Sequence, residues 1–276
     1  MATSDIPAID LDAYLRRIGL HAATASDLPT LRAIVQAHVA TIPFENLDPF
    51  LGKHVDLDFA AVQRKLVHDG RGGYCFEQNL LLGEALRAIG FPVTNLAARV
   101  LWGQPEAAIT ARSHMLLCIE IEARSWLADV GFGGKTPTGP LELVAEVEQA
   151  TPHETFRLTH GEDGDWRVQV LSDDACKALY RFDMQPQFPI DYRASNYWTS
   201  THPDSHFVTS LTAARAPSGR RLALRNREFT VQATGGEKRQ RTLHDAAEIR
   251  AVLRDEFLID PPSHPRLDEA LNRLPD

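Results

Sequence analysis

The sequence predicts an α+β protein in which helices come first along the chain and antiparallel strands follow. Apolar residues recur at helical spacing up to about residue 90. After Pro92 they alternate with polar residues, which is the period of a strand. Several short strands at close spacing are typical of an antiparallel sheet or a small barrel. The 276 residues, of which 43% are hydrophobic, suffice for one large domain or two to three small ones.

The helical part divides into four segments, which cover residues 10–19, 27–40, 56–68 and 75–89. The first has an aspartate at its start, Asp10, and a glycine at its end, Gly19. The last is expected to stop at Gly90, because glycine adopts the left-handed conformation that terminates many helices. Pro92 then prevents the helix from continuing.

The strands are expected to fill most of the remaining chain. They cover residues 93–102, 113–121, 125–132, 155–160, 165–171 and 179–184. A further pair, 221–224 and 228–233, is joined by a turn at 225–227, and a helix over 245–257 follows it. The changes of period place boundaries near residues 91 and 200.

Composition argues against two classes of partner. The net charge is −8 and there is no basic block, so we expect no binding to nucleic acid. The longest apolar stretches, such as 115–119, are too short to span a membrane. Residues 1–5 contain neither a basic segment nor an apolar run, so no signal peptide is expected.

The three cysteines favour a reducing environment. Cys75, Cys118 and Cys176 are odd in number and widely spaced, and none of them forms a metal-binding pair. We therefore expect a cytoplasmic protein without a metal site, in which an isolated cysteine is either buried or a nucleophile. Cys118 is expected to be buried on its strand, and Cys176 is expected to carry no chemistry.

Cys75 is the candidate nucleophile, because it follows two glycines and begins the fourth helix. The free N–H groups and the positive end of the helix dipole at that position favour the thiolate over the thiol. The thiolate is the form that reacts. Backbone N–H groups near this residue could also stabilise an oxyanion.

His114 and Asp129 are the candidate base and orienting group. They fall on neighbouring strands of one expected hairpin. A two-residue turn at Glu122 and Ala123 would place His114 opposite Gly131, with Asp129 on the same face, one diagonal step away. Any loop with an even number of residues keeps the two side chains on one face. The weak point is the turn, because Glu-Ala is not a favoured pair for it. On that face His114 could meet Cys75 from the helical layer.

These residues resemble the arylamine N-acetyltransferases. The run 71–75 (RGGYC), then His114, then 129–133 (DVGFG) matches the motifs of that family in order. The runs 43–47 (PFENL) and 200–207 (STHPDSHF) are similar to two further motifs. The resemblance extends from about residue 10 to the C-terminal helix.

The resemblance implies three parts around a core like that of cysteine proteases. They are an N-terminal helical bundle over 1–90, a central antiparallel β-barrel over 91–200 and a C-terminal α/β lid over 201–276. It also implies a catalytic triad, acetyl-CoA as donor, and arylamines, arylhydroxylamines or hydrazines as acceptors. Acetyl transfer would then follow a ping-pong course through an acetyl-cysteine. The triad would consist of Cys75, His114 and Asp129.

The resemblance further suggests supporting residues. Arg71 and Glu45 would form an ion pair that braces the turn before the cysteine, whereas the alternative is two solvated surface charges. Asn79 would hydrogen-bond nearby backbone. Three phenylalanines are candidates for the walls of an aromatic acceptor pocket, with ordinary core packing as the alternative; they are Phe44, Phe132 and Phe207.

The loop after Asp129 offers two more features. Its glycines, Gly131, Gly133 and Gly134, would let a ligand approach the backbone closely. Lys135 could meet a CoA phosphate, although a solvated surface lysine is the more common role.

Two other functions are compatible with the same residues. A cysteine hydrolase would use an identical triad with water as the second nucleophile, although papain-like enzymes carry a different run around their cysteine. A non-catalytic binding protein would keep Cys75 as an inert core thiol. The sequence does not identify the physiological acceptor, the preferred acyl chain length or the oligomeric state.

Overall fold

The computed structural model describes residues 8–21, 25–161, 164–172 and 175–275. Residues 1–7, on which the signal-peptide expectation depends, lie outside this part. The four helices expected in the N-terminal part are all present, namely α1 (Leu11–Arg17), α2 (Leu28–Thr41), α4 (Phe59–Gln63) with the π-helical turn η1 (Arg64–His68), and α5 (Cys75–Ile89). Asp10 caps α1 by accepting a hydrogen bond from the backbone of Ala13. Gly90 ends α5 in the left-handed conformation, as predicted.

An eight-stranded antiparallel sheet with the order β5-β4-β3-β2-β9-β8-β7-β6 follows and curls into a nearly closed barrel. Its strands are β2 (Val93–Val100), β3 (Arg112–Ile121), β4 (Arg124–Ala128), β5 (Leu141–Glu142), β6 (Glu148–Ala150), β7 (Thr155–His160), β8 (Trp166–Ser172) and β9 (Ala175–Phe182). The expected strand 125–132 therefore stops at Ala128. Beyond it the chain turns away, with Gly133 at a φ of +83°.

Alternation along β3 divides two apolar cores. Met115 and Leu117 pack with α1, α2 and α5 in the helical core, whereas Leu116 and Cys118 face the interior of the barrel. His114 lies two residues before Leu116 and so belongs to the same face of the strand as Leu116 and Cys118. The strand thus presents one face to the helices and the other to the barrel.

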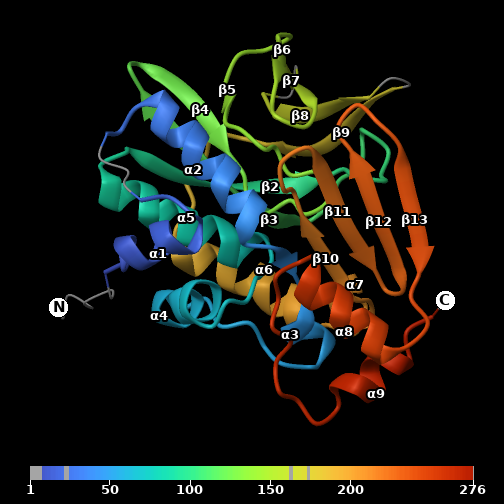
Figure 1. Ribbon diagram of the computed structural model, residues 1–276. Coiled ribbons are helices and arrows are strands. Elements are labelled where there is room, and N and C mark those ends of the chain that lie inside the picture. The colour runs from blue at the N-terminus through green and yellow to red at the C-terminus, as the bar shows by residue number, and fades with distance from the viewer. Residues whose placement is uncertain (1–7, 22–24, 162–163, 173–174, 276) are drawn as a thin grey trace.

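A second, separate sheet has the order β1-β10-β11-β12-β13 (Figure 1, where β10 to β13 are orange). It consists of β1 (Phe44–Glu45), β10 (Thr212–Arg215), β11 (Arg220–Arg225), β12 (Glu228–Ala233) and β13 (Lys238–Thr242). Helices α8 (Ala246–Asp255) and α9 (Leu267–Asn272) bury a third core against it. Because β1 comes from the N-terminal part, this sheet joins the two ends of the chain.

Four helices of the described chain were not predicted, namely α3 (Leu47–Phe50), α6 (Pro189–Thr201), α7 (His206–Thr209) and α9 (Leu267–Asn272). Of these, α6 is the longest, and it contacts β3, α3 and α7. It carries exposed apolar residues such as Ile190 and Tyr197 beside buried polar ones such as Asn196, so its sequence has no clear apolar stripe. It ends next to the boundary expected near residue 200, and the three-domain division stays a prediction.

Candidate active site

Cys75 is the first residue of α5 and is only 5% exposed. The chain reaches this position through a tight turn, in which a Cβ on Gly72 would lie 2.0 Å from the carbonyl oxygen of Pro43. Gly72 can therefore not be replaced without moving backbone. At the helix start, the backbone N–H of Tyr74 donates to the Glu77 carboxylate at 3.0 Å. The thiol is thus held at a fixed helix N-terminus.

The side chain of Gln78 secures the same turn from within the protein. Its Nε2 donates to the carbonyl oxygens of Pro43 and Gly73, at 2.7 and 3.1 Å. Its Oε1 lies 2.7 Å from Nε2 of His38, a fully buried residue. Burial lowers the pKa of His38 to about 4, so its imidazole is neutral and can take part in this chain without a buried charge.

The hairpin that carries His114 and Asp129 has the predicted two-residue turn. Glu122 and Ala123 adopt positive φ angles of 49° and 60°, which a type I′ turn requires. Leu117 pairs with Ala128, and the register of the whole hairpin follows from this. The unfavoured turn residues do not prevent it, because β3 and β4 are buried for most of their length.

His114 and Asp129 form a buried pair, in which Nε2 of the imidazole lies 2.7 Å from Oδ2 of the carboxylate. Burial alone would lower the pKa of His114, but the charge and hydrogen bond of Asp129 and the contact with Cys75 outweigh it and raise this pKa to about 10. Burial acts against the carboxylate as well, yet the charge of His114 keeps the pKa of Asp129 below its usual value. The two groups therefore form an ion pair.

The second ring nitrogen of His114, Nδ1, is left for the cysteine, whose proximity contributes to the raised pKa of the imidazole. The sulfur also lies 3.6 Å from the carbonyl oxygen of Ser113. The ring of His114 packs against those of Phe132 and Tyr180, with centroid distances of 5.3 and 5.0 Å, and it lies beside Cys75.

Asp129 accepts several further hydrogen bonds. Nδ2 of Asn79 donates to it at 3.0 Å, and the backbone N–H of Gly131 donates at 2.9 Å. The Tyr180 phenol faces the same carboxylate; burial, and then the interaction with Asp129, raise the pKa of this phenol well above its usual value. We call Asp129, His114, Asn79 and Tyr180 the Asp129 cluster. Its only charges are those of the His114–Asp129 pair.

Asn79 joins three elements, and its expected backbone hydrogen bonds are confirmed. Its amide donates to the carbonyl of Met115 at 2.7 Å and accepts from the N–H of Val130 at 3.1 Å. Gly131 is needed for the same close packing, because a Cβ there would lie 2.6 Å from Cα of Cys75. The missing side chain at Gly131 therefore makes room for the backbone of α5 and not for a ligand.

Arg71 and Glu45 form the expected ion pair, with Nε donating to Oε1 at 2.8 Å. Sequence analysis did not find the other members of this group. Lys65 lies 2.7 Å from both Asp48 and Glu77. Burial would lower the pKa of Lys65, but the carboxylates around it outweigh burial and raise it. We call these five residues the ionic cluster.

The three phenylalanines lie in two places. Phe44 and Phe207 contact each other with ring centroids 6.0 Å apart, and Phe207 also packs edge-on against Tyr74 at 5.7 Å. Phe132 is half-buried against His114. Phe132 therefore lies against the histidine, whereas Phe207, with Phe44 packed on it, lies against the residue that precedes the cysteine.

The remaining expectations concern peripheral residues. Lys135 is not simply solvated, because its Nζ lies 3.2 Å from Oε1 of Glu154. Cys118 is buried as predicted, and Cys176 is exposed. In the described part of the chain, no group of three or more histidine, cysteine or acidic residues could hold a metal ion. No described helix is long and apolar enough to cross a bilayer.

A cysteine at a helix N-terminus beside a buried histidine–aspartate pair is an arrangement typical of cysteine-dependent hydrolases and acyltransferases. A family model described as N-acetyltransferase matches residues 27–262. The chain is 42% identical over 248 residues to the arylamine N-acetyltransferase of Escherichia coli (strain K12), covering 90% of this chain and 88% of that protein. Against the Mycolicibacterium smegmatis arylamine N-acetyltransferase the identity is 43% over 258 residues, covering 92% and 93%.

Solved structures agree with these relatives. The arylamine N-acetyltransferase of Mycobacterium marinum in complex with CoA gives a TM-score of 0.91 at 39% identity, covering 96% of this chain and 99% of that one. The chain therefore belongs to the arylamine N-acetyltransferase family and is an enzyme of that family. The α+β fold is confirmed with it.

Proposed function

We propose that this enzyme transfers an acetyl group from acetyl-CoA to the nitrogen of arylamines, arylhydroxylamines or hydrazines through an acetyl-cysteine on Cys75. The observation that carries the proposal is the buried His114–Asp129 pair beside a cysteine at a helix N-terminus. The relatives in the same family support the acetyl donor and the acceptor class. The cytoplasmic location stays a prediction, with which the three free thiols agree.

In the first half-reaction, the Cys75 sulfur attacks the carbonyl carbon of the thioester. A carbon–sulfur bond forms to the enzyme, and the carbonyl electrons move to oxygen. Backbone N–H groups at the start of α5 can donate to that oxygen, at about 3 kcal/mol for each well-placed donor. The intermediate then collapses, the bond to the CoA sulfur breaks, and His114 gives its proton to the departing thiolate.

In the second half-reaction, the amine attacks the acetyl-cysteine. His114, now neutral, accepts the proton that the nitrogen loses as the new carbon–nitrogen bond forms. The bond between the acetyl carbon and Cys75 breaks, which restores the thiolate beside the imidazolium. Asp129 stays ionised throughout and keeps the imidazole in the tautomer whose Nδ1 is turned to the sulfur.

An aromatic acceptor would contact aromatic side chains near the sulfur. We propose Phe132, Phe44 and Phe207 as walls of its pocket, because Phe132 lies against His114 and the other two lie beside Tyr74, next to the cysteine. A ring stacked on such walls gains about 0.5–1.5 kcal/mol beyond its buried area.

The experiment follows CoA release from acetyl-CoA with and without an arylamine, together with the mass of the peptide that contains Cys75. We expect a burst of about one CoA per enzyme without the amine, an acetyl group on Cys75, and steady release only when the amine is added. Cys75→Ser should show neither burst nor turnover. Steady release without an amine would instead indicate a hydrolase, and the absence of any burst would indicate a binding protein.

A further inference from the structure

The loop that follows Asp129 closes on itself through one side chain, that of Thr136. Its hydroxyl donates to the carbonyl oxygen of Asp129 at 2.9 Å and accepts from the backbone N–H of Phe132 at 3.1 Å. A single buried oxygen, on a residue only 4% exposed, thus holds both the backbone of the carboxylate residue and the aromatic residue that packs on His114. Thr136 itself contacts neither the sulfur nor the imidazole.

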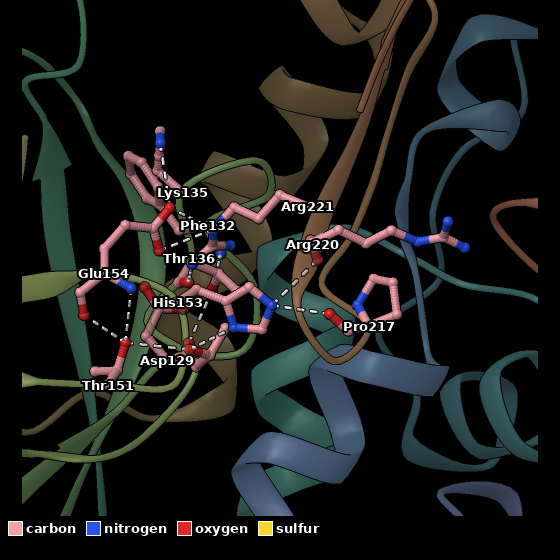
Figure 2. A network of polar contacts seen from close by, with 11 residues as sticks. Asp129, Phe132, Lys135, Thr136, Thr151, His153, Glu154, Pro217, Arg220 and Arg221 are labelled. Atoms are coloured by element: carbon pink, nitrogen blue, oxygen red, sulfur yellow. Dashed lines mark hydrogen bonds and ion pairs between the residues drawn. The ribbon is translucent and has the colours of Figure 1, made fainter. Parts of the chain in front are cut away.

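Thr136 is in turn fixed by a residue of the other sheet. Arg221, on β11, donates from Nη2 to the carbonyl oxygen of Thr136 at 2.8 Å. Its Nε lies 2.7 Å from Oε1 of Glu154, a residue of the loop between β6 and β7. Lys135 approaches the same carboxylate (Figure 2). Arg221 is 5% exposed, so its charge requires this carboxylate as a partner.

A neighbouring contact keeps Glu154 in place. Nε2 of His153 lies 2.8 Å from the carbonyl oxygen of Pro217 and 3.1 Å from that of Arg220, both in the turn before or at the start of β11 (Figure 2). The loop over 151–154 therefore contacts the five-stranded sheet through two successive side chains. The sheet and the barrel meet at this point.

From this geometry we infer that Thr136 is a positioning residue for the triad, and that Arg221 with Glu154 transmits the placement of the five-stranded sheet to it. The inference depends on the proposed function, because it assigns the role through Asp129 and His114. A shift of the Asp129 backbone would lengthen its bond to the imidazole, and displacements of about 1 Å can cost about 100-fold in rate.

The chain offers a matched control in Thr138. This residue is fully buried on the same loop, and its hydroxyl also makes two hydrogen bonds, to Oγ1 of Thr151 and Nδ1 of His153, both at 3.1 Å. Neither bond joins Asp129 or Phe132; both lead to the loop over 151–154, which is connected to Thr136 through Glu154 and Arg221. Thr136→Val and Thr138→Val therefore remove the same group from two buried positions. Only the first deletes a direct hydrogen bond to the backbone of Asp129, so the first should affect the chemistry far more.

The experiment measures the rate of the CoA burst against pH in the wild type, both valine variants and Thr136→Ser. We expect Thr136→Val to slow the burst about 10- to 100-fold, with Thr138→Val within about twofold of the wild type and Thr136→Ser largely restored. The basic limb of the pH profile should move to lower pH in Thr136→Val only, because Asp129 then supports the imidazolium less. The titratable groups that face this pair are Cys75 from α5 and Tyr180 from β9.

Equal rates and profiles for the two valine variants would overturn the inference. If Thr136→Val does not fold, Arg221→Lys decides the question, since a lysine cannot serve Glu154 and the Thr136 carbonyl together. We expect the same direction of change in Arg221→Lys at about 3- to 10-fold, and an unchanged burst would again overturn the inference. A wild type without any burst would instead contradict the proposed function itself, which separates the two failures.

Discussion

Two buried polar clusters flank Cys75, and they are built differently. The ionic cluster contains five charged side chains, and Lys65 and Arg71 in it are shared among three carboxylates. The Asp129 cluster has a single ion pair, and its other donors are neutral. Charged side chains that are shared among several partners hold the backbone in place. The single His114–Asp129 ion pair, which is supported by neutral donors, instead leaves the imidazolium proton available for transfer. We therefore expect substitutions in the first to cost stability and those in the second to cost rate.

The largest effect is expected for Asp129→Asn, which removes one charge from the Asp129 cluster. The amide can donate to His114 and so favours the wrong tautomer, at a cost of about 10³–10⁴ in the rate of acetyl transfer. The same change in the ionic cluster, Glu45→Gln, should lower the rate less than about tenfold. Steady-state kinetics with circular dichroism spectra checks both, and comparable rate losses would end the distinction between the clusters.

The next effect is expected for Arg71→Met, which leaves Glu45 buried without its partner. Breaking a buried ion pair in this way costs about 3–5 kcal/mol of the free energy of unfolding. Arg124→Met is the control, because Arg124 is 65% exposed and its contact with Glu142 is 3.6 Å long; we expect less than about 1 kcal/mol there. Guanidinium denaturation measures both, and similar losses would contradict the account.

The pH dependence of stability sharpens the comparison further. The pKa of His114 is raised from 6.5 in the unfolded chain to about 10 in the folded one. The contribution of this ionisation to the free energy of unfolding is therefore complete below pH 6.5 and is lost as the pH rises toward 10. The stability difference between the wild type and His114→Asn should shrink over that window. Denaturation series at pH 6.5, 8 and 9.5 test this, and a constant difference would show that His114 does not titrate there.

The smallest effect is expected for Tyr180→Phe, which deletes one neutral donor to Asp129 and keeps the ring. Loss of one hydrogen bond to a charged group predicts a rate about tenfold lower. Tyr192→Phe is the matched control, since its hydroxyl donates to the carbonyl of Leu96 at 3.0 Å, away from the pair. An equal rate loss in both variants would remove Tyr180 from the site.

The parts of the site that sequence reasoning found have local signals. A glycine turn before an apolar helical stripe predicts Cys75 at a helix start, and a two-residue turn determines which residues of β3 and β4 share a face. Tyr180 has no such signal, because a tyrosine at an inward strand position is indistinguishable from ordinary core. Asp48 and Lys65 likewise read as surface charges until the fold brings them together.

The same distinction holds for the fold. Helices with one apolar stripe, such as α5, are predictable, whereas α6 is not, because it buries Asn196 and exposes Ile190. Asn196 accepts a hydrogen bond from the hydroxyl of Tyr74 and donates to the carbonyl of Val55. Such a helix is stabilised by polar contacts to residues distant in the sequence, and the spacing of its own apolar residues does not reveal them.

The most direct measurement compares the rates at which iodoacetamide alkylates the three cysteines at pH 6, identified by mass spectrometry. If the His114–Asp129 pair holds Cys75 as a thiolate, this buried sulfur should react faster than the exposed Cys176, and Asp129→Asn should abolish its advantage. A Cys75 that reacts no faster than Cys176, or that keeps its rate without the carboxylate, would contradict the account.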